Sequence, residues 1–73
     1  MEEKIVAYIG RDSFGDLTVF LEKPKRHSES TIWGLEYGGE GKYFEIDRNL
    51  FPQVKWEDDE PTKVELTIKT CVI

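Results

Sequence analysis

Short runs of alternating apolar and polar residues, broken by glycine and proline, dominate this chain of 73 residues. The cleanest run covers residues 63–69, where Val64, Leu66 and Ile68 alternate with polar neighbours. A period of two residues is typical of a β-strand with one face toward a core. No stretch of eleven or more residues keeps its apolar groups at helical spacing, so strands must carry the fold.

The first half of the chain predicts a β-hairpin. Residues 4–10 carry apolar groups on both faces, which suits a strand that is central in its sheet. Residues 11–16 are rich in Asp, Ser and Gly, the residue types that support tight turns. Residues 17–22 resume the alternation, so we expect them to pair antiparallel with the first strand.

A second hairpin is expected further along. Residues 31–37 and 42–47 alternate like strands, and the glycine-rich residues 38–41 supply a reversal between them. The connection before them, residues 23–30, is polar and contains Pro24. Because it has no apolar residue to hold it against a core, we expect an exposed and mobile loop.

One helical turn is expected over residues 48–51. The Asp47 carboxylate can accept hydrogen bonds from the free N–H groups just ahead of it, and Pro52 would end the turn. Leu50 and Phe51 would then plug one end of the core. Five strands and this turn predict an all-β fold, either a small curled antiparallel sheet or an open five-stranded barrel.

The size and charge of the chain limit its organisation and partners. With 73 residues there is room for one core, so residues 1–73 are expected to form a single domain of modest stability, which leaves a homodimer as an alternative. The net charge of −5 argues against general attraction to nucleic-acid backbones or anionic lipids. The single cysteine, Cys71, cannot form an internal disulfide, and no apolar run or leader pattern indicates a membrane segment. We expect a cytoplasmic protein.

A longer pattern of residues carries a resemblance. Its most specific part is residues 50–61, where Leu50-Phe51-Pro52 precedes Val54, Trp56-Glu57-Asp58 and Glu60-Pro61. The other matching residues are Ala7-Tyr8-Ile9-Gly10-Arg11-Asp12, Gly15-Asp16-Leu17, Phe20, Lys23-Pro24, Tyr43-Phe44-Glu45-Ile46-Asp47 and Val64-Glu65-Leu66. In these residues the chain resembles a group of short uncharacterised proteins encoded by phages, prophages and mobile elements of gut bacteria. The resemblance implies an accessory protein that assists phage replication, modulates a host enzyme or binds another phage product, and it implies no cofactor or catalytic residue.

The residues themselves do not favour catalysis or metal binding. His27 and Cys71 are the only imidazole and thiol, and they lie in a polar loop and near the chain end. Four consecutive acidic residues, at positions 57–60, cannot all turn to one cation in extended chain. We therefore expect no enzyme activity, metal or cofactor. The acidic run is interpreted as a solvated connection held by Trp56 and Pro61, with attraction of a basic partner surface or mimicry of nucleic acid as alternatives.

Two binding hypotheses remain. The leading one is a non-catalytic protein-interaction module that meets an unidentified protein partner through a strand edge or through aromatic anchors at Phe20, Trp33 and Trp56. Such rings also fill cores, and Trp56 is expected to fold back as a lid on the barrel end, with Phe51 beneath it.

The alternative is a single-stranded nucleic-acid-binding accessory factor. Lys23, Lys25 and Arg26 form the one basic cluster and would contact phosphates, while exposed rings would stack on bases. The overall acidity of the chain weighs against this hypothesis.

Overall fold

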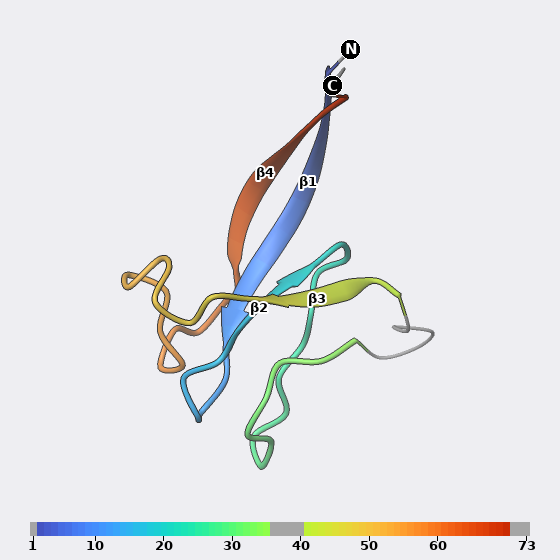
Figure 1. The fold of residues 1–73 in the computed structure, drawn as a ribbon. Helices are drawn as coiled ribbons and strands as arrows, with labels where there is room; N and C mark the ends of the chain where they lie inside the picture. Colours follow the sequence, from blue (N-terminus) through green and yellow to red (C-terminus); the bar gives the residue numbers. More distant parts are fainter. Residues whose placement is uncertain (1, 36–40, 71–73) are drawn as a thin grey trace.

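Four antiparallel strands form one open sheet in the computed structural model, which describes residues 2–35 and 41–70. The strands are β1 (Glu2–Arg11), β2 (Leu17–Phe20), β3 (Tyr43–Ile46) and β4 (Thr62–Lys69). They lie in the order β3-β2-β1-β4 (Figure 1). The all-β prediction is confirmed, but the predicted barrel and strongly curled sheet are wrong. Closure would require β3 to meet β4, and these two strands lie at opposite edges.

The β1–β2 hairpin forms as predicted, with Arg11 opposite Leu17 and Tyr8 opposite Phe20. Its turn follows the predicted chemistry. The Asp12 carboxylate accepts the backbone N–H groups of Phe14 and Asp16, at 2.9 and 3.0 Å. Gly15 has a φ of +94°, a conformation that residues with a Cβ rarely adopt.

The predicted second hairpin is wrong, because β3 pairs with β2 instead of with the segment before it. This register places Ile46 opposite Leu17 and Phe44 opposite Val19, so apolar residues of both strands share one face. Residues 31–35 form no strand beyond one isolated bridge between Gly34 and Lys25. The rest of the predicted second hairpin, residues 36–40, lies outside the described residues.

The core lies on the face of the sheet that carries the odd-numbered residues of β1. Ile9, Leu17 and Val54 form its buried centre, and Ile46 and Val64 pack against it while partly exposed. We call this the core face. The opposite face carries Tyr8 and Gly10 of β1 and their neighbours across the sheet, and we call it the outer face.

Leu50 and Phe51 do not plug the core, since 47% and 41% of their surface is exposed. The described residues contain no helix, and the predicted helical turn is a tight turn in which Leu50 N–H donates to the Asp47 carbonyl at 3.1 Å. The Asp47 carboxylate does accept the N–H of Asn49, at 2.8 Å, as predicted. Because the chain makes a turn here instead of a helix, it brings Val54 to the core in place of the two earlier residues.

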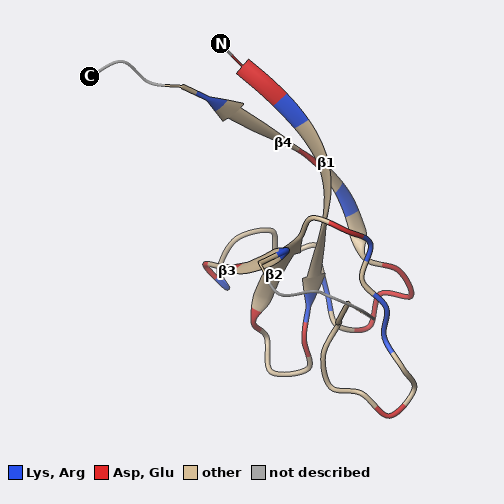
Figure 2. Ribbon diagram, turned by 90° about the vertical axis from the view of Figure 1, so that its right-hand side faces the viewer, with Lys and Arg blue, Asp and Glu red and all other residues tan. Residues whose placement is uncertain are grey.

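One part of the sheet projects beyond the rest. Residues 2–7 of β1 pair with residues 64–69 of β4 in register from Ala7–Val64 to Glu2–Lys69. We call this part the ribbon. It extends alone past the end of β2 (Figure 1), and acidic and basic residues are interspersed along it (Figure 2). The described part of the chain contains no helix with the length and apolar character of a membrane span.

Candidate interaction sites

Three residues singled out in the sequence meet in one stack. The guanidinium carbon of Arg26 lies 4.4 Å from the centre of the Trp33 ring and 4.5 Å from that of Trp56. The same guanidinium donates to the backbone carbonyls of Trp56 and of Asp58, the latter at 2.8 Å. A cation between two indoles is attracted to both ring faces. The nucleic-acid hypothesis named Arg26, and the protein-interaction hypothesis named Trp33 and Trp56. In the structure these three residues contact one another and hold their loops together.

The polar loop of residues 23–30 is largely exposed, as predicted, and the stack attaches it at Arg26 to the rings of Trp33 and Trp56. Its mobility stays a prediction. Pro24 is fully buried, and the backbones of Lys25 and Gly34 exchange hydrogen bonds of 2.8 and 2.9 Å. The N–H of Ser13 donates to the carbonyl of Thr31 at 2.9 Å and anchors the far end. Apart from Pro24, the loop contains no apolar side chain that could pack against a core. The Arg26 guanidinium, held by the two indole rings, anchors the loop instead.

The basic cluster is therefore partly engaged within the protein. Arg26 lies in the stack, and the Lys23 ammonium pairs with the Glu60 carboxylate at 3.1 Å. This ion pair is exposed and contributes little to stability. The nucleic-acid hypothesis stays a prediction, and its cations are engaged within the protein in the described structure.

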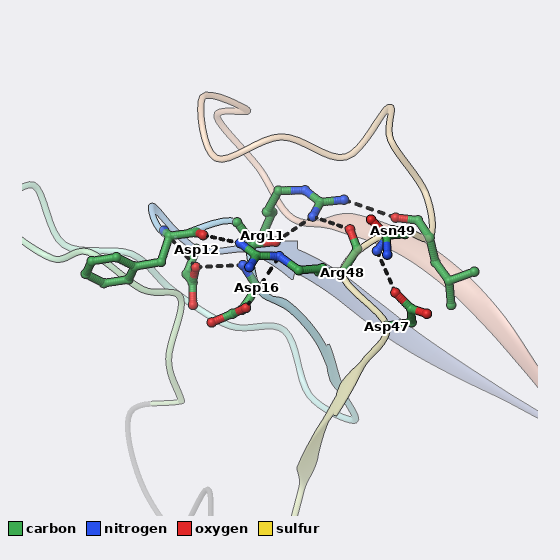
Figure 3. Close-up of polar contacts among 9 residues, drawn as sticks. Arg11, Asp12, Asp16, Asp47, Arg48 and Asn49 are labelled. Carbon is green, nitrogen blue, oxygen red and sulfur yellow. Dashed lines mark hydrogen bonds and ion pairs between the residues drawn. The ribbon is translucent and has the colours of Figure 1, made fainter.

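A second arginine, Arg11, lies at the end of β1 and organises the backbone around it (Figure 3). The guanidinium of Arg11 donates to five backbone carbonyls, those of Val54 at 2.7 Å, Gly15 at 2.6 Å, Arg48 at 2.9 Å, Leu50 at 3.0 Å and Phe51 at 3.2 Å. One of these, Phe51, has a φ of +48°, which a bulky residue seldom adopts. Arg11 thus holds a strained connection against the end of the β1–β2 hairpin. The sequence carries no signal for this role.

The ribbon presents an open edge. The register of β1 with β2 begins at Tyr8, so residues 2–7 have a strand partner on only one side among the described residues. Ile5 and Ile68 lie on the core face of the ribbon, where 40% and 52% of their surface is exposed. The described residues cover these side chains only in part, whereas Ala7 and Ile9 on the same face of β1 are buried.

A pocket of about 430 Å³ opens on the outer face. Its floor follows two cross-strand rows, Gly10 with Thr18 and Glu45, and Phe20 with Tyr43. The loop that carries the stack forms its far wall. The described lining residues are Gly10, Asp12, Thr18, Phe20, Ile32, Trp33, Gly34, Leu35, Tyr43 and Glu45.

The predicted aromatic anchors are mostly covered. Phe20 and Trp33 are 4% and 7% exposed, and both contribute to the pocket lining. Trp56 is partly buried over Arg26, and the barrel end that it was expected to cover does not form. Among the described residues, the exposed rings are instead those of Phe14, Tyr43, Phe44 and Phe51. Sequence reasoning did not single out Phe14 or Phe44 and expected Phe51 in the core, because alternation identifies faces without showing which face is covered.

The acidic run, residues 57–60, lies in the connection between β3 and β4, and its side chains form contacts there. The Asp58 carboxylate accepts the N–H of Lys55 at 3.0 Å, and Glu60 pairs with Lys23. No group of three or more potential metal ligands converges within residues 2–35 and 41–70. His27 is exposed, and Cys71 lies outside the described residues.

Comparison with known proteins adds no family to this geometry: the chain matches no protein-family model, no curated protein and no solved structure.

Proposed function

We propose that the protein is a non-catalytic interaction module that receives an extended segment of a partner protein along the open edge of β1. One observation carries the proposal: β2 stops opposite Tyr8, and residues 2–7 continue beyond it with β4 as their one described neighbour. Backbone N–H and C=O groups on such an edge are ready to pair with an added strand.

The apolar side chains of the ribbon support this proposal. An isolated pair of strands is marginally stable in water, and this pair also exposes Ile5 and Ile68 on its core face. A strand added beside residues 2–7 would continue the line of β2 and give the ribbon a third strand. Its apolar side chains would lie next to Ile5 and reduce the exposed apolar surface.

Charge favours a different protein over a second copy of this chain as the occupant. Two copies that each carry a net charge of −5 repel one another. Antiparallel pairing of two β1 edges centred on Lys4 would also place the two Lys4 side chains directly opposite each other, which destabilises that register. A homodimer is therefore the competing outcome.

The resemblance to phage and mobile-element proteins suggests where such a partner is found. An accessory protein of this kind would bind a host protein or another phage product, and we expect it to do so in the cytoplasm.

The test is selection from a displayed library of extended peptides of about ten residues, the upper end of common strand length. Amide chemical shifts and hydrogen exchange would then locate the selected peptide. We expect shifts and new amide protection in residues 2–7. The double variant Ile5→Lys/Ile68→Lys should weaken binding at least about tenfold, because it places charges on the apolar face of the ribbon.

The matched control is Leu50→Lys, which changes a comparably exposed apolar residue at the opposite end of β1. It should leave peptide affinity unchanged. Selected peptides that perturb only residues outside the ribbon would contradict the proposal. So would a protein that sediments as a dimer with residues 2–7 already protected, since the occupant would then be a second copy.

A further inference from the structure

The pocket on the outer face has aromatic walls that are held in place before any ligand arrives. The ring centres of Phe20 and Tyr43 are 6.2 Å apart, with the rings tilted by 38°. Trp33 packs against Gly10 so closely that a Cβ there would lie 2.7 Å from the indole Cδ1. Arg26 covers the indole from the loop side. The walls of the pocket are therefore largely fixed, which lowers the ordering cost of binding.

The charged groups at the pocket are carboxylates. Glu45 is exposed on β3, and its side-chain carboxylate forms no hydrogen bond or ion pair with any described residue. Asp12 uses Oδ1 to accept two backbone N–H groups, while its Oδ2 accepts none from the described residues. No lysine or arginine is among the described residues that line the pocket. The cavity thus combines the exposed Tyr43 ring with two carboxylates, while the Arg26 guanidinium lies 4.4 Å from the centre of the Trp33 ring on the loop side.

We infer that this pocket binds a small organic cation of the alkylammonium class. Aromatic faces attract ammonium groups through their quadrupole, and this attraction is the basis of aromatic cages for quaternary ammonium ligands. Glu45 adds charge complementarity. A volume of about 430 Å³ lies in the range of small-molecule sites. We therefore commit to a free small molecule as the ligand and not to a side chain of a partner protein.

The inference is independent of the proposed function, because the two surfaces lie on different parts of the sheet. The pocket belongs to the outer face between β1, β2 and β3, whereas the open edge belongs to the ribbon. Ile5→Lys/Ile68→Lys should leave cation binding unchanged. Failure of either proposal therefore leaves the other standing.

The experiment is a titration of the isotopically labelled protein with choline chloride. The amide signals of Thr18 and Glu45 and the indole N–H of Trp33 report on the pocket. The neutral reference is 3,3-dimethylbutan-1-ol, which has the shape of choline without its charge. We expect choline to shift these signals with saturation, and the alcohol to bind at least about fivefold more weakly, as an exposed cation–π contact and ion pair together imply.

Two variants separate charge from ring contacts. Glu45→Gln should weaken choline binding about three- to fivefold, and Tyr43→Leu, which keeps an apolar side chain, should weaken it about two- to fivefold. Glu29→Gln removes an exposed carboxylate that does not line the pocket. This control should bind choline like the unaltered protein.

Four results would overturn the inference. Equal affinity for choline and the alcohol would show a merely apolar pocket. Undiminished binding by Glu45→Gln, or shifts confined to residues outside the pocket, would place the cation elsewhere. Stronger binding of a lysine-containing tripeptide than of choline would assign the pocket to a protein side chain and not to a free small molecule.

Discussion

The two halves of β1 follow the same alternating pattern but have different surroundings. In the inner half, Ile9 lies between β2 and β4 and is 2% exposed. In the outer half, Ile5 lies on the same face and is 40% exposed. The two halves differ in what covers them: loops and a second neighbouring strand cover the inner half, and no loop or second strand within residues 2–35 and 41–70 does so along the ribbon. Alternation therefore predicts the orientation of a side chain without predicting its burial.

The two halves also differ in how they are fastened. At the inner end, Arg11 donates to five backbone carbonyls, one in the β1–β2 turn and four in the connection between β3 and β4. Arg26 joins two loops through its contacts with Trp33 and Trp56. Beyond the backbone pairing of β1 with β4, the described side chains of the ribbon form exposed ion pairs, such as Lys4 with Glu65 at 3.7 Å and Lys69 with Glu2 at 3.7 Å. Exposed pairs of this kind contribute between zero and about 1 kcal/mol. Stability should therefore concentrate in the inner half.

The largest expected effect comes from the core itself. Leu17→Ala removes a fully buried side chain and should lower the free energy of unfolding by about 3 kcal/mol, since it leaves a cavity. The matched ribbon variant Ile5→Ala should cost less than about 1 kcal/mol, because much of that side chain already contacts water. Denaturant unfolding followed by tryptophan fluorescence measures both. Equal losses would show that the ribbon is covered in solution.

Replacing the inner arginine should have the next largest effect. Arg11→Lys keeps the charge but cannot reach five carbonyls from one ammonium group, so unfolding should become easier by about 2 kcal/mol. Lys4→Arg, a change between the same residue types on the ribbon, should alter the free energy of unfolding by less than about 0.5 kcal/mol. If Arg11→Lys left the free energy of unfolding unchanged, the connection between β3 and β4 would keep its position without these hydrogen bonds.

The arginine between the two indoles should matter less. Arg26→Ala removes two cation–π contacts and two hydrogen bonds, and should cost about 1 to 2 kcal/mol. It should also shift the emission of Trp33 and Trp56, because both rings lose the same neighbour. The control is Lys23→Ala, whose exposed ion pair with Glu60 predicts a loss below about 0.5 kcal/mol. Unchanged emission in Arg26→Ala would argue against the stack in solution.

Hydrogen exchange compares the two halves without any substitution. The amides of residues 2–6 should exchange through local opening of the ribbon, while those of Ile9 and Val19 should wait for unfolding of the sheet. Added denaturant should therefore reduce the difference in exchange rate between the two halves, because denaturant promotes global unfolding more than local fraying. Equal protection along the whole of β1 would contradict an uncovered ribbon.

Local chemistry explains what could be predicted from sequence. The β1–β2 hairpin, the faces of β4 and the acceptor role of Asp47 depend on residues close along the chain, where turn propensity and a two-residue period apply directly. The acidic and aromatic residues of the pocket were visible as residue types. Their convergence was not, because Glu45 and Trp33 approach each other only after β3 pairs with β2 and the intervening loop folds over Gly10.

The misplaced elements have a common cause. Residues 31–35 alternate like a strand, yet Trp33 fits above Gly10, where a missing side chain leaves room for an indole. That fit takes the segment out of the sheet and leaves β2 to pair with β3. Similarly, Arg26 in a polar loop suggests a solvent-exposed cation until two distant rings enclose it.

By itself, the sequence determined that this protein is built of strands, where its first turn lies and which side chains share a face, because these properties arise between near neighbours. Only the tertiary structure decided which strands pair, which aromatic rings are covered, and that the ribbon keeps an open edge beside a separate pocket. These outcomes depend on contacts between residues far apart in the chain, where several pairings bury similar apolar surface and the fit of particular side chains selects among them.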